Sequence, residues 1–344
     1  ENSRDTLVFA RGGDAVSLDA AAVTDGESLR VTHNIYETLL NFNEEDTTIV
    51  AGLAKEWDVS EDGLTYTFKL QEGVKFHDGN DFNAEAVVKN FERWSAGAKD
   101  TFYYYNSMFR AEDKDIIASV TAQDANTVVF TLTRPQAPFL KNIAMAMFGI
   151  ASPAAFDTLG EQPVGTGPFK FKEWKRNDSI TLVKNEEYWQ EGLPKLSTVI
   201  FRTIPDNSAR LNALTTGEID IAEGLNPSDA ESIKSNADLQ LIERPSMNIG
   251  YLGMTATRGP FGDKNVRQAV NYAIDKQAIV DAFFQGYASV AVNPMPPSIS
   301  GYNEDIKGYE YNPEKAKELL ASSSYNGEEL ELWAMPVARP YMPD

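Results

Sequence analysis

Residues 51–94 constrain the fold more than any other stretch, because strand, turn and helix signals follow one another without a gap. Asp62-Gly63 separates two apolar runs, and this dipeptide is a strong hairpin signal. After it, apolar and polar side chains alternate over 64–70, the period of a half-buried strand. Asn83 can cap a helix with Glu85 in its first turn, and the apolar face of that helix is formed by Val87, Val88, Phe91 and Trp94. The stretch predicts a small α+β layer with its own core.

The rest of the chain mixes strands and helices, which predicts an α/β protein. Strands are predicted at 6–11, 127–132, 169–174, 179–184, 198–203, 219–222, 248–254 and 329–333. Helices are predicted over 28–40, from Asp206 or Asn207 to Gly217, after Asn226-Pro227, over 266–274, from Asp275 to Gly286, and from Asn312-Pro313 to about Ser322. The Met-rich segment 139–148 is expected in the core.

Length and charge narrow the class of protein. The chain has 344 residues, enough for two or three compact units. Its net charge of -20 argues against a nucleic-acid partner, because phosphates need Lys and Arg. No apolar run is long enough for a transmembrane helix. The polar start at Glu1 is typical of a mature or trimmed chain without a signal peptide.

The scarcity of soft metal ligands argues against a metalloprotein. The chain has no Cys, and its only histidines are His33 and His77. A zinc or copper site built from protein side chains alone is therefore not expected. No calcium-binding loop of the D-x-[DN]-x-[DN]-G type is present either. We expect no cofactor.

Several stretches resemble one known family along the whole chain. The segment LAKEW-x-VSEDGLTYTFKLQEGVKFHDG, followed by FNAEAVV, resembles the signature of the bacterial extracellular solute-binding proteins of the peptide/nickel ABC-transporter family, family 5. Further matching stretches are GTGPF (165–169), NIGYL (248–252), NVRQAVNYAIDKQAIV (265–280) and YNPEKAKELL (311–320). The stretch LWAMPVARPYMP (332–343) is most similar to the dipeptide-binding members.

The resemblance implies a fold and a domain order. The expected fold is the α/β, periplasmic-binding-protein-like, two-lobed fold of class II, with an extra inserted α+β domain. Domain I would comprise 1–43 and 163–243, domain II would be the insertion 44–162, and domain III would be 244–344. Family members continue beyond this point, so we expect the chain to be C-terminally incomplete, with domain III unfinished.

The resemblance also implies a function. The chain would be the substrate-binding component of an ABC importer, binding dipeptides or short oligopeptides between two lobes. It would deliver them to the transmembrane subunits of a permease, acting as a monomer outside the cytoplasmic membrane. It would be either free in a periplasm or lipid-anchored on the outer face of that membrane. The same fold could instead bind glutathione, haem or a nickel complex.

Arg339 is the strongest candidate for a ligand contact. It lies in MPVARPY, where the resembling dipeptide-binding proteins place the Arg that pairs with the ligand carboxylate. The planar guanidinium can donate two parallel hydrogen bonds to a carboxylate, although a single Arg is more often a solvated or structural ion-pair partner. The Asp that receives the ligand amine is expected downstream of Asp344. Weaker candidates are Gly12, Gly13, Asp14, Asn248 and Met335.

A secreted hydrolase is the competing class. The G-x-S-x-G motif, which carries the nucleophilic Ser of many hydrolases, is absent. The near match at Gly26-Glu27-Ser28 has Arg30 where the motif requires its second Gly. No sequence spacing identifies a pair of carboxylates for glycoside hydrolysis. His77-Asp78 resembles a catalytic dyad, but it lacks the third positioned group that such catalysis needs. The GTG turn is no phosphate loop, because no Gly-Lys-Ser/Thr follows. The sequence therefore favours a binding protein over an enzyme.

Overall fold

The structure is a computed structural model that describes residues 5–44, 46–112, 114–299 and 301–334. The chain divides into two compact units, Glu1–Glu223 and Gly224–Asp344. Among the described residues, no helix is both long and apolar enough to cross a membrane.

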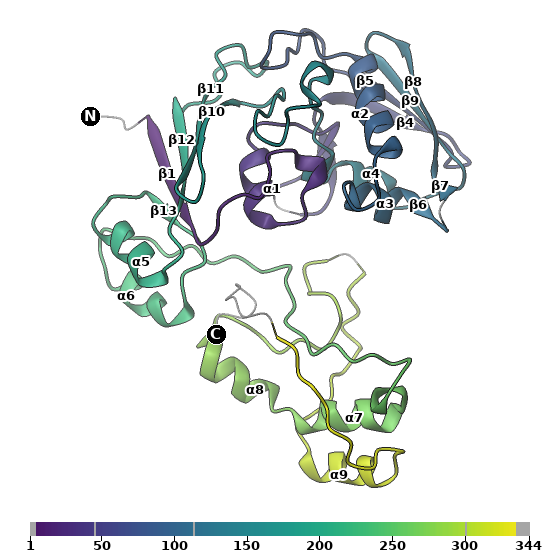
Figure 1. The fold of residues 1–344 in the computed structure, drawn as a ribbon, viewed down its shortest axis with the longest axis vertical. Helices are drawn as coiled ribbons and strands as arrows, with labels where there is room; N and C mark the ends of the chain where they lie inside the picture. The colour runs from purple at the N-terminus through teal and green to yellow at the C-terminus, as the bar shows by residue number, and fades with distance from the viewer. Residues whose placement is uncertain (1–4, 45, 113, 300, 335–344) are drawn as a thin grey trace. The chain divides into compact units, whose positions relative to one another are not determined.

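The first unit contains a five-stranded sheet in the order β10-β11-β12-β1-β13 (Figure 1). β1 runs parallel to β12, with Thr6 opposite Thr198, and parallel to β13 on its other side. β11 is antiparallel to both β10 and β12. Residues 6–11 and 169–203 thus share one sheet, although the predicted domain boundaries themselves stay a prediction. The strands are β1 (Thr6–Arg11), β10 (Phe169–Lys175), β11 (Ser179–Lys184), β12 (Thr198–Thr203) and β13 (Ile221–Ala222).

Alternate residues of β1 point to opposite faces of this sheet. Leu7 and Phe9 pack in the core that includes Val31 of α1, whereas Val8 and Ala10 pack with Ala213 of α5. Because side chains alternate between the two faces of a strand, β1 packs against helical segments on both faces of the sheet. The helices are α1 (Gly26–Thr32) and α5 (Asn207–Thr215), with a short 3-10 helix at Ala20–Ala22. Of the two predicted caps, Asp206 and Asn207, it is Asp206 that caps α5, because its side chain accepts from the N–H of Ala209.

A second, antiparallel sheet has the order β4-β5-β9-β8 and carries α2 on one face (Figure 1). Asn83 caps α2 as predicted, accepting from the N–H of Ala86 at 3.0 Å. The ring of Phe91 on α2 meets that of Phe130 on β9 edge-on, with 4.8 Å between their centroids. The predicted α+β layer with its own core is confirmed. The elements are β4 (Ala54–Val59), β5 (Thr65–Leu70), α2 (Ala84–Ala96), β8 (Ile117–Asp124) and β9 (Thr127–Leu132).

The segment 139–148 lies in the same core, as predicted, with Phe139, Ile143, Met147 and Phe148 buried. Smaller elements complete the first unit. They are β2 (Leu40–Phe42), β3 (Ile49–Ala51), α3 (Tyr103–Phe109), β6 (Arg110–Ala111), β7 (Lys114–Asp115), α4 (Phe139–Ile143) and 3-10 helices at Ala146–Phe148 and Pro153–Ala155.

The regular elements in the described part of the second unit are helices, and α7 packs against α9. The predicted caps Asp275 and Asn312 are confirmed, since their side chains accept from the N–H groups of Ala278 and Lys315. The elements are α6 (Ala230–Lys234), α7 (Lys264–Ala273), α8 (Lys276–Ile279), a π-helical turn at Val280–Phe284, α9 (Pro313–Ala321), and 3-10 helices at Pro227–Asp229 and Pro260–Gly262.

Four predictions of secondary structure were wrong. The helix predicted over 28–40 ends at Thr32, because the carbonyl groups of Asn34 and Ile35 accept from Phe169 and Gly167 instead of continuing the helix. The strands predicted at 248–254 and 329–333 are absent from the described residues. A strand needs a neighbouring strand to satisfy its backbone groups, and no ladder forms in the described part of the second unit. Asn226 makes no side-chain capping bond, although Pro227 does begin a 3-10 helix.

Candidate functional site

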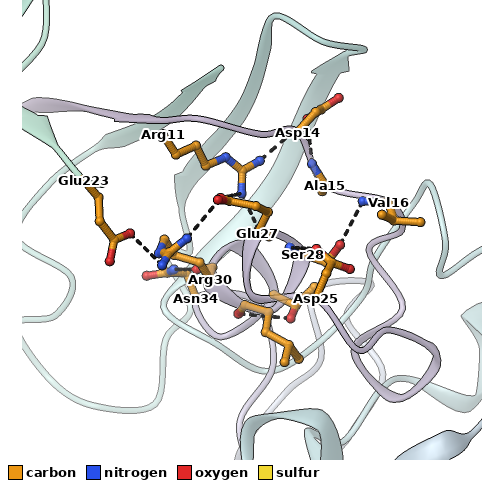
Figure 2. Close-up of polar contacts among 12 residues, drawn as sticks. Arg11, Asp14, Ala15, Val16, Asp25, Glu27, Ser28, Arg30, Asn34 and Glu223 are labelled. Carbon is orange, nitrogen blue, oxygen red and sulfur yellow. Dashed lines mark hydrogen bonds and ion pairs between the residues drawn. The ribbon is translucent and has the colours of Figure 1, made fainter. Parts of the chain in front are cut away.

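The candidate site of the first unit lies where the parallel strands β12, β1 and β13 end. Ligands of open α/β sheets bind outside the carboxyl ends of the strands. β1 ends at Arg11 and leads directly into residues 12–14, which we name the glycine loop. Glu27 and Arg30 of α1 lie near Arg11 and Asp14, and Glu223, the residue after β13, lies next to Arg30 (Figure 2).

The backbone N–H groups of Gly12 and Gly13 are available for a ligand. Gly12 is exposed and Gly13 is half-buried. No hydrogen bond within the described part of the chain involves the backbone N–H groups of these two residues. A Cβ atom on Gly13 would lie 3.4 Å from Cγ of Glu27. The loop therefore offers unpaired main-chain donors without a side chain to block close approach.

Asp14, predicted with the glycines as a ligand contact, uses its carboxylate inside the protein. The carboxylate accepts from Ala15 N at 2.8 Å, Trp174 Nε1 at 3.0 Å and Asn177 N at 2.8 Å. These bonds tie the glycine loop to the hairpin between β10 and β11. The geometry gives Asp14 a role in holding the loop, and a ligand contact by Asp14 stays a prediction.

A network of alternating charges, which no pattern in the sequence indicates as a whole, includes Arg11 directly before the loop (Figure 2). Arg11 is only 1% exposed, and its Nη1 donates to the carbonyl oxygen of Glu27. Arg30 Nη1 donates to Glu27 Oε2 at 3.0 Å, and Arg30 Nη2 lies 2.6 Å from Glu223 Oε2. Burial lowers the pKa of Arg11 and raises the pKa of Glu27. The Glu27–Arg30 spacing is a local signal for an ion pair, but nothing in the sequence places Glu223 beside them.

Ligand contacts by the other predicted site residues stay predictions. Asn248 lies in the second unit, where it is exposed and its N–H donates to Ser246 Oγ. Met335 and Arg339 lie outside the described residues. Gly12, Gly13 and Asp14 lie together in one loop of the first unit.

The His77-Asp78 pair does not form a catalytic dyad. His77 Nε2 lies 2.8 Å from the carbonyl oxygen of Gly167, and Asp78 accepts from Ser152 Oγ at 2.6 Å. The two side chains thus have separate partners. The described residues also contain no group of three or more His, Cys, Asp or Glu side chains placed to hold a metal ion.

The fold, with its mixed sheet and appended α+β layer, is that of the two-lobed periplasmic binding proteins, a class of solute-binding protein. Residues 48–339 match the family described as bacterial extracellular solute-binding proteins, family 5. The chain belongs to this family.

Known members resemble the chain over nearly all of its length. It is 36% identical to the dipeptide-binding protein of Escherichia coli, over 98% of this chain and 67% of that protein. It is 35% identical to heme-binding protein A of Haemophilus influenzae, over 100% of this chain and 66% of that protein. The periplasmic binding protein DppA of Helicobacter pylori, solved with the peptide STSA, superposes with a TM-score of 0.85 at 39% identity, over 93% and 66% of the two chains. The chain thus spans about two thirds of the length of these relatives.

Proposed function

We propose that the chain is the substrate-binding component of an ABC importer, binding dipeptides or short oligopeptides and delivering them to a membrane permease. One observation carries the proposal: the chain resembles the peptide-bound Helicobacter pylori protein in both sequence and fold. The similarity to the Escherichia coli dipeptide-binding protein supports the same ligand class.

The glycine loop fits a peptide ligand chemically. Its free N–H groups can pair with peptide carbonyl oxygens, which are the same whatever side chains the peptide carries. Arg339 would pair with the terminal carboxylate through its planar fork. The buried charges of a peptide need such partners, because an unpaired charge away from water is costly. Such a site recognises the peptide main chain and tolerates varied sequences.

The ligand can be identified directly. Native mass spectrometry of the undenatured protein should find a retained peptide, and calorimetric titration should show binding of a dipeptide. Mass analysis of that dipeptide after incubation should return it intact, because a transport protein releases its ligand unchanged. Hydrolysis of the dipeptide would support the enzyme class instead. A bound species without a carboxylate would overturn the peptide assignment.

A second candidate ligand is haem, favoured by the similarity to heme-binding protein A. Glutathione and a nickel complex are further alternatives within the same fold. Titration with haem, followed by its Soret absorbance, separates haem from peptides, because a peptide has no such band. Competition between haem and a dipeptide would show whether they share one site.

The proposed importer component works outside the cytoplasmic membrane, in a periplasm or held by a lipid anchor. It acts as a monomer beside the permease, and its net charge of -20 does not suit a nucleic-acid partner. Cell fractionation of the full-length product tests the location. Recovery of that product in the cytosol would contradict the proposed location. Light scattering measures the molar mass in solution and so tests the proposed monomeric state.

A further inference from the structure

Arg30 joins two carboxylates that belong to distant parts of the chain. It lies on α1 with 31% of its side chain exposed, and Glu27 and Glu223 are each 29% exposed. Its Nη1 binds Glu27 and its Nη2 binds Glu223, so the two ends of one guanidinium hold different partners (Figure 2). Ion pairs shielded to this degree are less screened by water and salt than fully exposed pairs.

Glu27 connects this bridge to the glycine loop. The carbonyl oxygen of Glu27 accepts from Arg11 Nη1, and the Cγ of Glu27 lies against Gly13. The Nη1 of Arg11 also lies 3.5 Å from Glu27 Oε2, so Glu27 holds this buried guanidinium through both its carbonyl oxygen and its carboxylate. At the other end of the guanidinium, Nη2 lies 3.6 Å from Asp14 Oδ1 of the glycine loop. The N–H of Val16, just beyond the loop, donates to Ser28 Oγ on the same helix at 2.8 Å. Helix α1 therefore supports the loop at both of its ends.

Glu223 connects the bridge to the end of β13. This strand has only two residues, Ile221 and Ala222. Glu223 follows it and is held by its N–H, which donates to Ala10 O at 3.0 Å, and by its carbonyl oxygen, which accepts from Arg210 Nε at 3.1 Å. It is the last residue of the first unit. A strand this short gains little from its own ladder, so side-chain contacts contribute much of its attachment.

We infer that Arg30 is a positioning residue, which fixes the glycine loop and the end of β13 relative to each other. The inference rests on the proposed function, in which the glycine loop contacts the ligand. Replacing Arg30 with a neutral side chain would leave Glu27 and Glu223 without their shared cation and expose them to mutual repulsion. A Lys at this position could serve only one carboxylate well, because an ammonium lacks the planar fork.

Hydrogen exchange of the protein without ligand tests the inference. The variants are Arg30→Met, Arg30→Lys and the control Arg202→Met, which removes an exposed ion pair with Glu218 in the same unit. In Arg30→Met, the amides of Val16 and Glu223 should exchange about tenfold faster, more than the loss of a fully exposed ion pair produces. Arg30→Lys should fall between wild type and Arg30→Met, and the control should match wild type.

The amide of Asp220 provides an internal reference, because it donates to Val8 O at the other end of β13. Its exchange should stay unchanged in Arg30→Met, which separates local loosening from general destabilisation. Wild-type exchange rates at Val16 and Glu223 in Arg30→Met would overturn the inference. Equal acceleration at Asp220 would also overturn it, because it would show a general loss of stability.

Dipeptide titration of the full-length protein tests whether Arg30 affects ligand affinity. Arg30→Met should bind about tenfold more weakly than wild type, with partial recovery in Arg30→Lys. Unchanged affinity in Arg30→Met would overturn the positioning role in binding. If wild type bound no dipeptide, the proposed function would fail, whereas the exchange experiment, which needs no ligand, would still decide the role of Arg30.

Discussion

His77 Nε2 lies 2.8 Å from the carbonyl oxygen of Gly167, 90 residues further along the chain. The N–H of His77 also donates to Gly165 O at 2.9 Å, so one residue of the appended layer holds both glycines of the GTGPF turn. A carbonyl oxygen only accepts, so Nε2 carries the proton of the neutral ring. Burial lowers the pKa of His77 to about 4.

The burial of the His77 ring predicts a pH dependence of stability. The folded pKa of about 4 lies below the ordinary value of 6.5, so the unfolded chain binds more protons between these values. Stability should therefore fall as the pH drops from about 6.5 to about 4, by roughly 3 kcal/mol at most from this group. Urea unfolding of wild type and His77→Gln, followed by tryptophan fluorescence, isolates the effect. The stability of wild type relative to His77→Gln should decrease across that window, and a constant difference would contradict the prediction.

A second prediction concerns the buried carboxylate of Glu37. It accepts from Tyr188 Oη at 2.7 Å, Thr166 Oγ1 at 2.7 Å and Trp189 Nε1 at 3.1 Å, and burial raises its pKa. Tyr188→Phe should cost about 1 kcal/mol of unfolding free energy, because it removes one hydrogen bond. Glu37→Ala should cost about 3 kcal/mol or more, because three donors lose their acceptor at once. Thermal unfolding checks both values, with the exposed Glu61→Gln as the control.

A third prediction concerns Gly165, which has no room for a side chain. A Cβ atom there would lie 2.1 Å from the backbone carbonyl oxygen of Ile35. Gly165→Ala should therefore cost about 3 kcal/mol or more, since backbone atoms cannot move aside as a flexible side chain can. Gly26→Ala is the matched control, because a Cβ atom on Gly26 meets no atom within 4 Å. Equal unfolding midpoints for the two variants would contradict the predicted clash.

Local signals in the sequence predicted much of this fold. The caps Asn83, Asp275 and Asn312 were predicted because a capping side chain binds backbone groups only a few residues away. The helix predicted over 28–40 failed because Gly167 N and Phe169 N, far along the chain, bind carbonyl groups that the helix would have used. The strands predicted at 248–254 and 329–333 had the right composition, but composition does not supply a pairing partner.

The candidate site shows the same limit. A glycine pair after a strand marked the loop, since such a pair lets another molecule approach the backbone closely. The sequence could not show that Asp14 binds Trp174 and Asn177, or that Arg30 reaches Glu223, because these partners are brought together only by the sheet. Pairings over such sequence distances follow from tertiary structure, not from local patterns.

The last prediction concerns Arg339, which the family resemblance assigns to the ligand carboxylate. Arg339→Ala in the full-length protein should leave a buried carboxylate unpaired, at a cost of about 2–5 kcal/mol. This corresponds to a loss of roughly 30-fold to several thousand-fold in affinity. Arg339→Lys should recover only part of the loss, because an ammonium cannot donate the two parallel hydrogen bonds. Calorimetric titration with a dipeptide and with its C-terminal amide measures the effect, and wild type should prefer the free carboxylate. Equal binding of the two ligands by wild type, or unchanged dipeptide affinity in Arg339→Ala, would show that Arg339 does not contact the carboxylate.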